Sequence, residues 1–284
     1  MRDKLKIGIT FAIFNNIKFT KKYLTSLFSN KSKHNLHVII VDNGSTDNSQ
    51  EIIKKEFPQA HIISNKENMG CAIAWNQGLQ NCVDEGCDYF VLSQNDITIS
   101  SGTIDKCVDF LEENKNFEII SPVFINSPWH SDINLTQKQL DIVATQCQKK
   151  FGGGMDWSFS FYFFMMRPSV FQKVQFDERF RKVFFEDYDF YNSIYLNRIV
   201  GTQSVDIGVG MHKFSATVAI AGKNLGLNEN KKIFQEKWKD KEDMINEGRK
   251  FVNSFLTVKA RYKRKHLGLD IEGENLYPVR EEEE

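Results

Sequence analysis

The sequence predicts an α/β fold, with a mostly parallel sheet flanked by helices. Apolar runs of strand length alternate with helical patterns along the first half of the chain, and this alternation is typical of a parallel sheet covered by helices. Each of the first four expected strands also ends in a polar loop, which is where open α/β sheets bind ligands. With 284 residues, 41% hydrophobic and 26% charged, the chain has a globular composition and enough length for a full core.

Periodicity defines the elements of the first half. The expected strands are short apolar runs that stop at polar residues, at 7–14, 37–41, 61–64 and 88–92. The expected helices between them have apolar residues at helical spacing, around 19–28, 52–57 and 71–82. Asp47 precedes the second of these helices, and its carboxylate is expected to cap that helix.

The second half has a different pattern. Residues 127–150 are polar without a strand pattern, which indicates an inserted excursion or a helical lid. An aromatic strand is expected after residue 156, then a short helix opened by Pro168 and another opened by the acidic residues 186–189. The remaining expectations are a strand ending near His212 and charged helices over 228–255.

Composition excludes several classes of protein. The five cysteines form no Cys-x-x-Cys pair, and we find no secretory segment, so free thiols in a reducing, cytoplasmic compartment are expected. No apolar run reaches the roughly 18–20 residues that cross a bilayer. The chain lacks the glycine-rich motifs of dinucleotide-binding and P-loop enzymes. Its formal net charge of zero argues against a globally basic nucleic-acid binder.

Four separated motifs carry a resemblance to a known family. They are Val41-Asp42-Asn43-Gly44-Ser45-Thr46-Asp47, Asn68-Met69-Gly70, Gln94-Asn95-Asp96, and the run from Phe176-Asp177-Glu178-Arg179-Phe180 to Phe185-Glu186-Asp187-Tyr188-Asp189-Phe190. In this order and spacing, the chain resembles the family 2 inverting glycosyltransferases of GT-A fold, in particular the rhamnosyltransferase-like branch. The resemblance covers about residues 5–240. It implies a GT-A (Rossmann-like) sheet and transfer of a sugar from a nucleoside diphosphate donor.

Donor recognition is expected at Asp42. A carboxylate at this strand end can accept a hydrogen bond from the imide N–H of uracil or thymine, and the resemblance implies this role. The alternative is a turn with a local cap. The other donor-binding residues that the resemblance implies are Thr10, Phe14, Lys66, Asn68, Gly70, Asn95 and Trp157. For Thr10 and Phe14 an ordinary strand position remains an alternative, as does a core position for Trp157.

A divalent cation, Mn²⁺ or Mg²⁺, is implied at Gln94-Asn95-Asp96. This tripeptide stands where the family has Asp-x-Asp, so only Asp96 is left as the principal carboxylate ligand. Asn95 is at best an auxiliary contact to the metal or the ribose. His212 matches the position of a metal-binding His in many relatives, although a lone His is more often structural.

The acidic cluster around residue 187 is the candidate catalytic group. Helix dipoles favour acids at a helix start, but three acids within four positions also raise carboxylate pKa values. By resemblance, Asp187 is the general base that deprotonates the acceptor hydroxyl, with Glu186 beside it in the site. Asp189 is expected to point into the helix packing or to a structural partner. The run 234–238 is similar to a C-terminal helix of the family.

The sequence therefore predicts a metal-dependent inverting hexosyl- or pentosyltransferase that uses a UDP- or dTDP-sugar and a saccharide or glycolipid acceptor. Alternatives are glycosylation of a modified base in DNA, or nucleotide-sugar binding without turnover.

The predicted catalytic domain is 1–227, with a nucleotide-binding half at about 1–125 and an acceptor half at about 150–227. Residues 228–284 are expected to form a helical segment and a charged tail. The basic cluster at 259–266 is a solvated tail, or contacts a membrane surface or nucleic acid.

Overall fold

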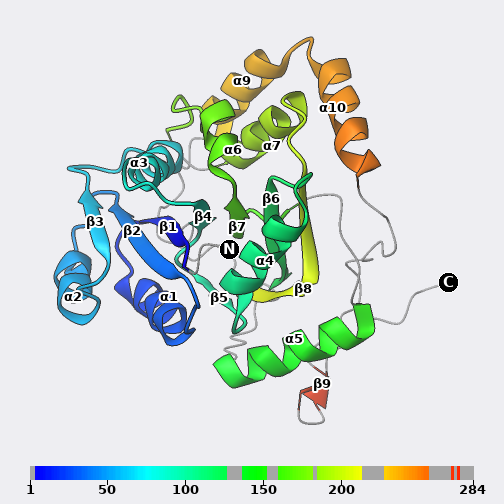
Figure 1. The fold of residues 1–284 in the computed structure, drawn as a ribbon. Coiled ribbons are helices and arrows are strands. Elements are labelled where there is room, and N and C mark those ends of the chain that lie inside the picture. The colour runs from blue at the N-terminus through cyan, green and yellow to red at the C-terminus, as the bar shows by residue number, and fades with distance from the viewer. Residues whose placement is uncertain are drawn as a thin grey trace.

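The computed structural model describes residues 4–126, 136–151, 159–181, 184–212 and 227–255, and short strands at 270–271 and 274–275. In this part of the chain, eight strands form one sheet in the order β3-β2-β1-β4-β7-β6-β8-β5, flanked by helices (Figure 1). The α/β prediction is confirmed.

The first half is a parallel β-α unit. Its strands are β1 (Lys6–Ile13), β2 (Asn35–Asp42), β3 (His61–Ser64) and β4 (Tyr89–Ser93). Its helices are α1 (Ile17–Ser29), α2 (Ser49–Glu56) and α3 (Cys71–Asp84). All neighbouring strands in this half run parallel. The predicted strands agree with these bounds to within one or two residues, and Asp47 supports the start of α2 by accepting a hydrogen bond from the Ser49 N–H at 3.0 Å.

The second half is mixed. Its strands are β5 (Ile97–Ile99), β6 (Ile119–Asn126), β7 (Phe163–Met166) and β8 (Gly201–His212). Its helices are α4 (Thr103–Glu113), α5 (Gln137–Phe151), α6 (Pro168–Lys173) and α7 (Glu186–Leu196). Here β7 is antiparallel to β4 and β6, β5 is antiparallel to β8, and β6 is parallel to β8. Sequence patterns did not predict β5, α4 or β6.

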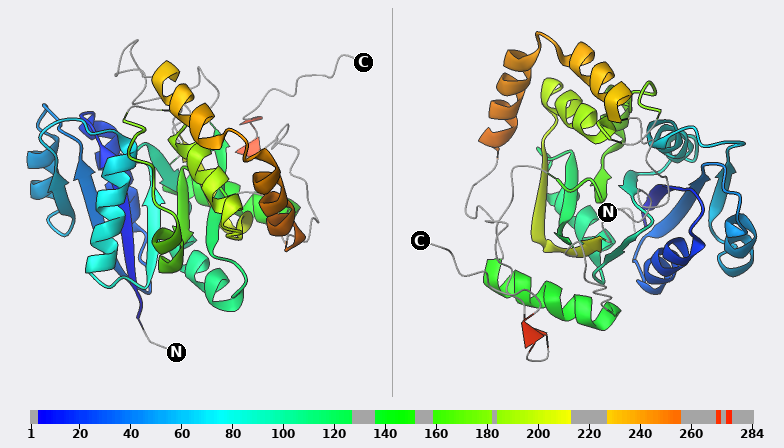
Figure 2. Two further views of the ribbon diagram at one scale, coloured as in Figure 1. Left: turned by 90° about the horizontal axis from the view of Figure 1, so that it is seen from above. Right: turned by 180° about the vertical axis from the view of Figure 1, so that it is seen from behind.

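Two further helices, α9 (Leu227–Trp238) and α10 (Glu242–Ser254), follow the sheet. They lie beside α7 in all three views (Figures 1 and 2). Gly248 of α10 permits this approach, because a Cβ there would lie 1.9 Å from the Tyr195 carbonyl oxygen. The pair β9 (Asp270–Ile271) and β10 (Glu274–Asn275) is a separate antiparallel ribbon.

The segment predicted as an excursion or lid contains α5. This helix packs against β8 and β5, so the described part of the segment is helical, and a lid role stays a prediction. The preceding residues 127–135 lie outside the described residues, as does the basic cluster at 259–266.

Candidate active site

The sheet brings the ends of β1, β2 and β3 to one edge. Ile13 is in register with Asp42, and Asp42 with Ser64, so the loops after these three strands start at the same level. Ligands of α/β sheets bind at this edge. The predicted donor residues fall on these loops because parallel strands all end on the same side.

Asp42 is fully buried at this edge and already accepts two hydrogen bonds. Its Oδ1 accepts from the Ser45 N–H at 3.0 Å, and its Oδ2 accepts from the Gln50 side-chain amide. Gln50 in turn accepts from the Ser64 hydroxyl at 3.1 Å. The structural alternative for Asp42, a local turn, is therefore present, and a role in base recognition would come in addition to it.

Asn43, which sequence reasoning did not single out, connects the loops after β2 and β3, residues 43–48 and 65–70, which adjoin or carry predicted donor residues and are named the nucleotide-side loops. Its Nδ2 donates to Asn68 Oδ1 at 2.9 Å and to the Gly70 carbonyl at 3.2 Å, and its Oδ1 accepts from the Met69 N–H at 3.0 Å. Asn43 is only 3% exposed. The structure thus joins the predicted residues Asn68 and Gly70 to the loop that follows Asp42.

The turn after β1 was also missed by sequence reasoning. Asn15 and Asn16 both have left-handed backbones, with φ of 56° and 60°. The Asn15 side chain accepts hydrogen bonds from the N–H groups of Thr46 at 2.8 Å and Asp47 at 3.2 Å. An Asn-Asn pair directly after a strand was the available signal, because Asn tolerates the left-handed region better than most residues.

The other predicted donor-binding residues are not part of the hydrogen-bond network of Asp42 and Asn43 among the described residues. Thr10 lies three residues before the end of β1 and is fully buried against Gly78 of α3. Asn95 donates its amide hydrogen to the Thr20 hydroxyl at 2.9 Å, which directs the amide nitrogen toward α1. Phe14 is half-buried and Lys66 is exposed. Trp157 lies outside the described residues. The binding roles of these five residues remain predictions.

Asp96 and His212, the two predicted metal ligands, meet in the structure. His212 Nε2 lies 3.4 Å from Asp96 Oδ1, and the two side chains are 6% and 7% exposed. The His212 ring stacks on Tyr162, with centroids 3.9 Å apart. Asp96 Oδ1 is buried without a hydrogen-bond donor among the described residues. A buried acceptor beside an imidazole nitrogen fits a hard divalent cation.

Asp96 and His212 would supply only part of a metal ion's coordination sphere. Among the described residues, no group of three or more His, Cys, Asp or Glu side chains is arranged to hold a metal ion. Two protein ligands nevertheless suit Mg²⁺ or Mn²⁺, because such ions at nucleotide sites take their remaining ligands from phosphates and water.

The predicted catalytic acids open α7 as expected. Glu186 is 8% exposed, and its Oε2 has no hydrogen-bond donor among the described residues. Burial, together with the neighbouring Asp187, raises the pKa of Glu186 to about 8. Burial also raises the pKa of Asp187, whose Oδ1 accepts from the Tyr188 N–H at 2.8 Å. A carboxylate whose pKa is shifted toward neutrality suits a general base.

The segment that leads into the acidic start of α7 lies next to the loop that ends at Gly70. A Cβ on Gly70, where φ is 91°, would lie 2.5 Å from the Arg181 carbonyl oxygen, so only glycine permits this close approach. Burial, assisted by the charge of Glu186, raises the pKa of the following Cys71 thiol to about 12. The loop at Gly70 and the start of α7 thus share one region.

Asp189 faces a structural partner, as predicted. Its carboxylate accepts hydrogen bonds from Lys237 Nζ at 2.9 Å and from Trp238 Nε1 at 2.8 Å. With 1% exposure, Asp189 is not available to a substrate.

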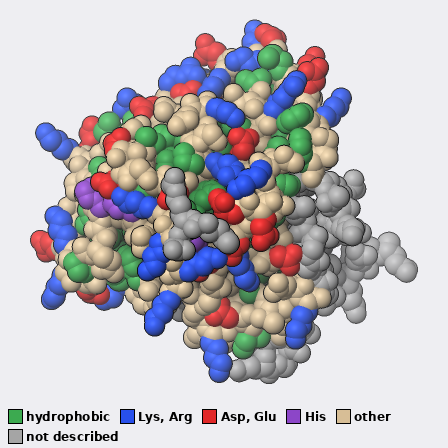
Figure 3. Space-filling model, in the orientation of Figure 1, with side chains coloured by type: hydrophobic (Ala, Val, Ile, Leu, Met, Phe, Trp, Pro, Cys, Tyr) green, Lys and Arg blue, Asp and Glu red, His purple; other side chains and the backbone are tan. Residues whose placement is uncertain are grey.

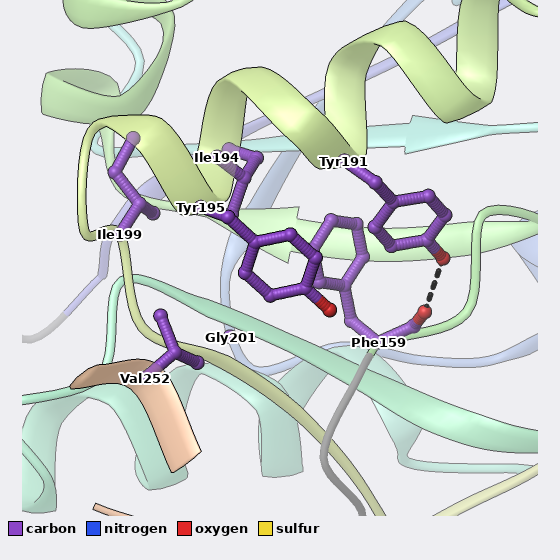
Figure 4. A pocket seen from close by; sticks show the side chains of 7 residues that line it. All are labelled: Phe159, Tyr191, Ile194, Tyr195, Ile199, Gly201 and Val252. Carbon is purple, nitrogen blue, oxygen red and sulfur yellow. Dashed lines mark hydrogen bonds between the residues drawn. The ribbon is translucent and has the colours of Figure 1, made fainter. Parts of the chain in front are cut away.

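A small apolar cleft, partly open to solvent, lies between α7, α10 and the start of β8 (Figure 4). It is lined by Phe159, Tyr191, Ile194, Tyr195, Ile199, Gly201 and Val252. Tyr191 closes one side by donating a hydrogen bond to the Phe159 carbonyl at 2.5 Å. None of the predicted site residues lines this cleft, so it belongs to the packing of α7 against α10.

A model of the family described as glycosyl transferase family 2 matches residues 9–187, which is more than half of the chain. The chain belongs to glycosyl transferase family 2. The matched region contains the loops after β1, β2 and β4, and it ends at Asp187.

Curated proteins similar to this family 2 chain include two from Bacillus subtilis. The chain is 26% identical over 201 residues to the minor teichoic acid biosynthesis protein GgaA, covering 66% of this chain and 43% of GgaA. It is 33% identical over 110 residues to GgaB, covering 37% of this chain and 12% of GgaB. The chain spans less than half the length of the curated relatives it matches.

Solved structures confirm the GT-A fold of this family 2 chain. The mannosyltransferase PcManGT of Pyrobaculum calidifontis, in complex with GDP-Man and Mn²⁺, has a TM-score of 0.56 at 12% identity, covering 88% of this chain and 75% of that structure. TarS of S. aureus, in complex with UDP, has a TM-score of 0.52 at 15% identity, covering 84% and 72%. No helix in the described part of the chain has the length and apolar character of a membrane span.

Proposed function

We propose that this family 2 protein is an inverting glycosyltransferase that moves a sugar from a UDP- or dTDP-sugar to a hydroxyl of a saccharide or glycolipid. The observation that carries the proposal is the pairing of Asp96 with His212 at the sheet edge where the Asp42 loop also lies. Membership of glycosyl transferase family 2, and the nucleotides present in the complexes of its structural neighbours, support the same class of reaction.

In this proposal, Asp187 takes the proton of the acceptor hydroxyl. The oxygen attacks the anomeric carbon opposite the nucleotide, the bond from that carbon to the diphosphate breaks, and the configuration inverts. Asp96 and His212 would hold Mg²⁺ or Mn²⁺, which supplies charge neutralisation for the departing diphosphate when bound. Glu186, protonated at neutral pH because its pKa is about 8, supplies a hydrogen-bond donor beside Asp187 without adding a second negative charge.

Base selection is proposed for Asp42. An ionised carboxylate offers about four acceptor positions, and two of those on Asp42 accept from Ser45 and Gln50. Since Asp42 is fully buried, the base reaches it when the Gln50 amide moves aside. The imide N–H of uracil or thymine then takes the place of the amide hydrogen.

A saccharide acceptor is supported by exposed aromatic rings next to Asp187. Tyr188 is 62% exposed and Phe184 is 39% exposed, whereas most large aromatic side chains of this protein are buried. Exposed aromatic faces beside a reactive carboxylate suit the apolar faces of sugar rings. On the face in Figure 3, described Lys and Arg side chains are interspersed with Asp and Glu, which is not the uniformly basic surface that nucleic acid favours.

The proposal is tested by nucleoside diphosphate release from UDP-, dTDP- and GDP-hexoses with mixed saccharide acceptors, in Mn²⁺, in Mg²⁺ and in excess chelator. We expect release from a UDP- or dTDP-sugar that stops in chelator and returns with the metal. Asp96→Ala and His212→Ala should each weaken metal-dependent donor binding measured by calorimetry. Full activity in chelator would refute the metal role, and turnover confined to GDP-sugars would refute the donor assignment.

A further inference from the structure

The turn that leads into α7 has a strained backbone. Phe184 and Phe185 have φ of 78° and 73°, although neither is glycine. Consecutive left-handed residues of this kind are strained and persist only where their surroundings fix them. Because Glu186 and Asp187 follow directly, whatever fixes the turn also fixes the direction of these acids.

Helix α9 holds the strained residues Phe184 and Phe185, which precede the acids of α7. Asn230 Nδ2 donates a hydrogen bond to the Phe184 carbonyl oxygen at 2.9 Å, and Asn230 is 3% exposed. The rings of Phe234 and Phe185 contact each other, with centroids 5.4 Å apart. One residue of the strained pair is therefore held by a buried amide and the other by an aromatic contact, both from the same helix.

Helix α9 also holds the chain on the other side of Asp187. Both oxygens of the buried Asp189 carboxylate are bound by its last two residues: Oδ1 accepts from Trp238 Nε1 at 2.8 Å, and Oδ2 accepts from Lys237 Nζ at 2.9 Å. A buried carboxylate left without such partners is strongly unfavourable, so this contact is firmly held.

Lys237 of α9 also contacts a third segment, the loop between α6 and α7. Lys237 Nζ also lies 2.9 Å from Asp177 Oδ2, and Asp177 pairs with Arg179 at 2.6 Å. The Arg179 guanidinium holds the pKa of Asp177 well below its usual range. Lys237 thus ties α7 and the loop before it to one ammonium group.

We propose that α9 positions the catalytic turn, and that Asn230, Lys237 and Trp238 are positioning residues for Asp187. The inference rests on the proposed function of Asp187 as the base. Residue 187 lies between the two points that α9 holds, residues 184 and 189, and α9 lies alongside α7 in every view (Figures 1 and 2). Misplacement by about 1 Å can cost about 10²-fold in rate, so these contacts control turnover without touching substrate.

The test uses the full chain and the most rapidly turned-over donor of the panel above. Trp238→Phe keeps the ring and removes only the N–H donor, and Lys237→Met removes the ammonium group. We expect kcat to fall at least tenfold in each, with the KM for the donor and the calorimetric Kd for UDP within twofold of the wild type. Lys237→Arg should recover a large part of kcat. The matched control is Lys232→Met, an exposed lysine of α9, which should leave kcat unchanged.

A double variant separates positioning from loss of folded protein. In the Asp187→Asn background, adding Trp238→Phe should reduce the residual rate less than twofold, because the base whose position matters is already absent. Wild-type kcat in both Trp238→Phe and Lys237→Met would overturn the positioning role, as would an additional tenfold loss in the double variant. If Asp187→Asn itself keeps full turnover, the proposed base is wrong, which is a different outcome.

Discussion

At the scale of single residues, the surroundings of each acidic side chain at the start of α7 determine whether it has a structural role or is available for chemistry. Glu186, Asp187 and Asp189 lie within four positions, yet Asp189 is bound on both oxygens by α9, whereas Glu186 Oε2 is buried without a donor among the described residues. Burial raises the pKa values of Glu186 and Asp187. The same residue type is therefore structural at one position and available for chemistry two positions away.

The role of Asp187 is tested by Asp187→Asn. Nucleotide binding should stay nearly intact, while turnover should fall by roughly 10²–10⁴-fold, because a positioned base contributes about that much. Product release under saturating donor, together with calorimetric UDP binding, measures both effects. Turnover at the wild-type level would remove Asp187 from the mechanism.

Glu186 should make stability depend on pH. Its pKa rises from 4.5 to about 8 in the folded protein, so between these values the folded state holds a proton that the unfolded state has lost. The stability that protonated Glu186 contributes is therefore fully present below about pH 4.5 and is lost as the pH rises toward 8. We expect the free energy of unfolding of the wild type, relative to Glu186→Gln, to fall by a few kcal/mol across this range, since each pKa unit corresponds to about 1.4 kcal/mol. Urea unfolding of both proteins at pH 5, 6.5 and 8 measures the difference, and parallel pH curves would contradict the assignment.

At the scale of elements, α3 sets the spacing between the sheet and the nucleotide-side loop. Gly78 lies directly on Thr10 of β1, and Gly70 at the start of the helix lies against the Arg181 backbone. Both glycines permit approaches that a side chain would block. The position of the loop at Asn68 therefore depends on how closely α3 packs on β1.

Gly78→Ala should weaken this packing. The new Cβ would lie 1.9 Å from Thr10 Oγ1, and overpacking of this kind costs roughly 1–3 kcal/mol. Chemical denaturation should show a loss in that range. Adding Thr10→Ala removes the Oγ1 contact and leaves the Thr10 Cβ at 2.8 Å, so it should restore only part of the loss. If the loss in the double variant equals or exceeds the sum of the two single losses, the clash is not with Thr10.

At the scale of the whole molecule, the sheet joins a parallel half to a mixed half. The strand order places β4 beside β7, and their antiparallel pairing links the nucleotide-side loops to the segment that leads into α7. The domain boundary at 227/228 stays a prediction. The contacts of Asn230 and Trp238 with α7 show that the segment after this boundary shares a packed interface with the segment before it.

The preference for one nucleotide over another depends on the loops that meet at the carboxyl ends of β1, β2 and β3. Thermal unfolding in the presence of different nucleotides tests this preference. With metal present, UDP and dTDP should stabilise the protein more than ADP, GDP or CDP, because in the proposed mode Asp42 would accept from an imide N–H, whereas cytosine offers a bare acceptor at that position. Ligand at about 100 times its dissociation constant adds about 2.7 kcal/mol. Asp42→Asn should abolish the preference, whereas Gln50→Ala should preserve it. Equal stabilisation by GDP would contradict base recognition by Asp42.

The sequence alone determined the alternation of strands and helices in the first half, the polar loops at strand ends, and the acidic start of α7. These features are local: strand periodicity, turn residues and helix-start preferences act over a few positions. The missed elements have weaker local signals, since β5 is only three residues long and β6 contains Pro122. The family resemblance implied Asp96 and His212 as ligands of one metal ion, and the structure places the two side chains 3.4 Å apart; metal binding by them stays a prediction.

Tertiary structure alone decided how the remaining residues are used. Asn43 organises the nucleotide-side loops, Gln50 occupies an oxygen of Asp42, and Asn230 holds the carbonyl of Phe184. Each is a polar residue whose partner becomes its neighbour only after strands pair and helices pack. The physical reason is burial: once the chain closes over these groups, each needs a hydrogen-bond partner, and the fold determines which partner is within reach.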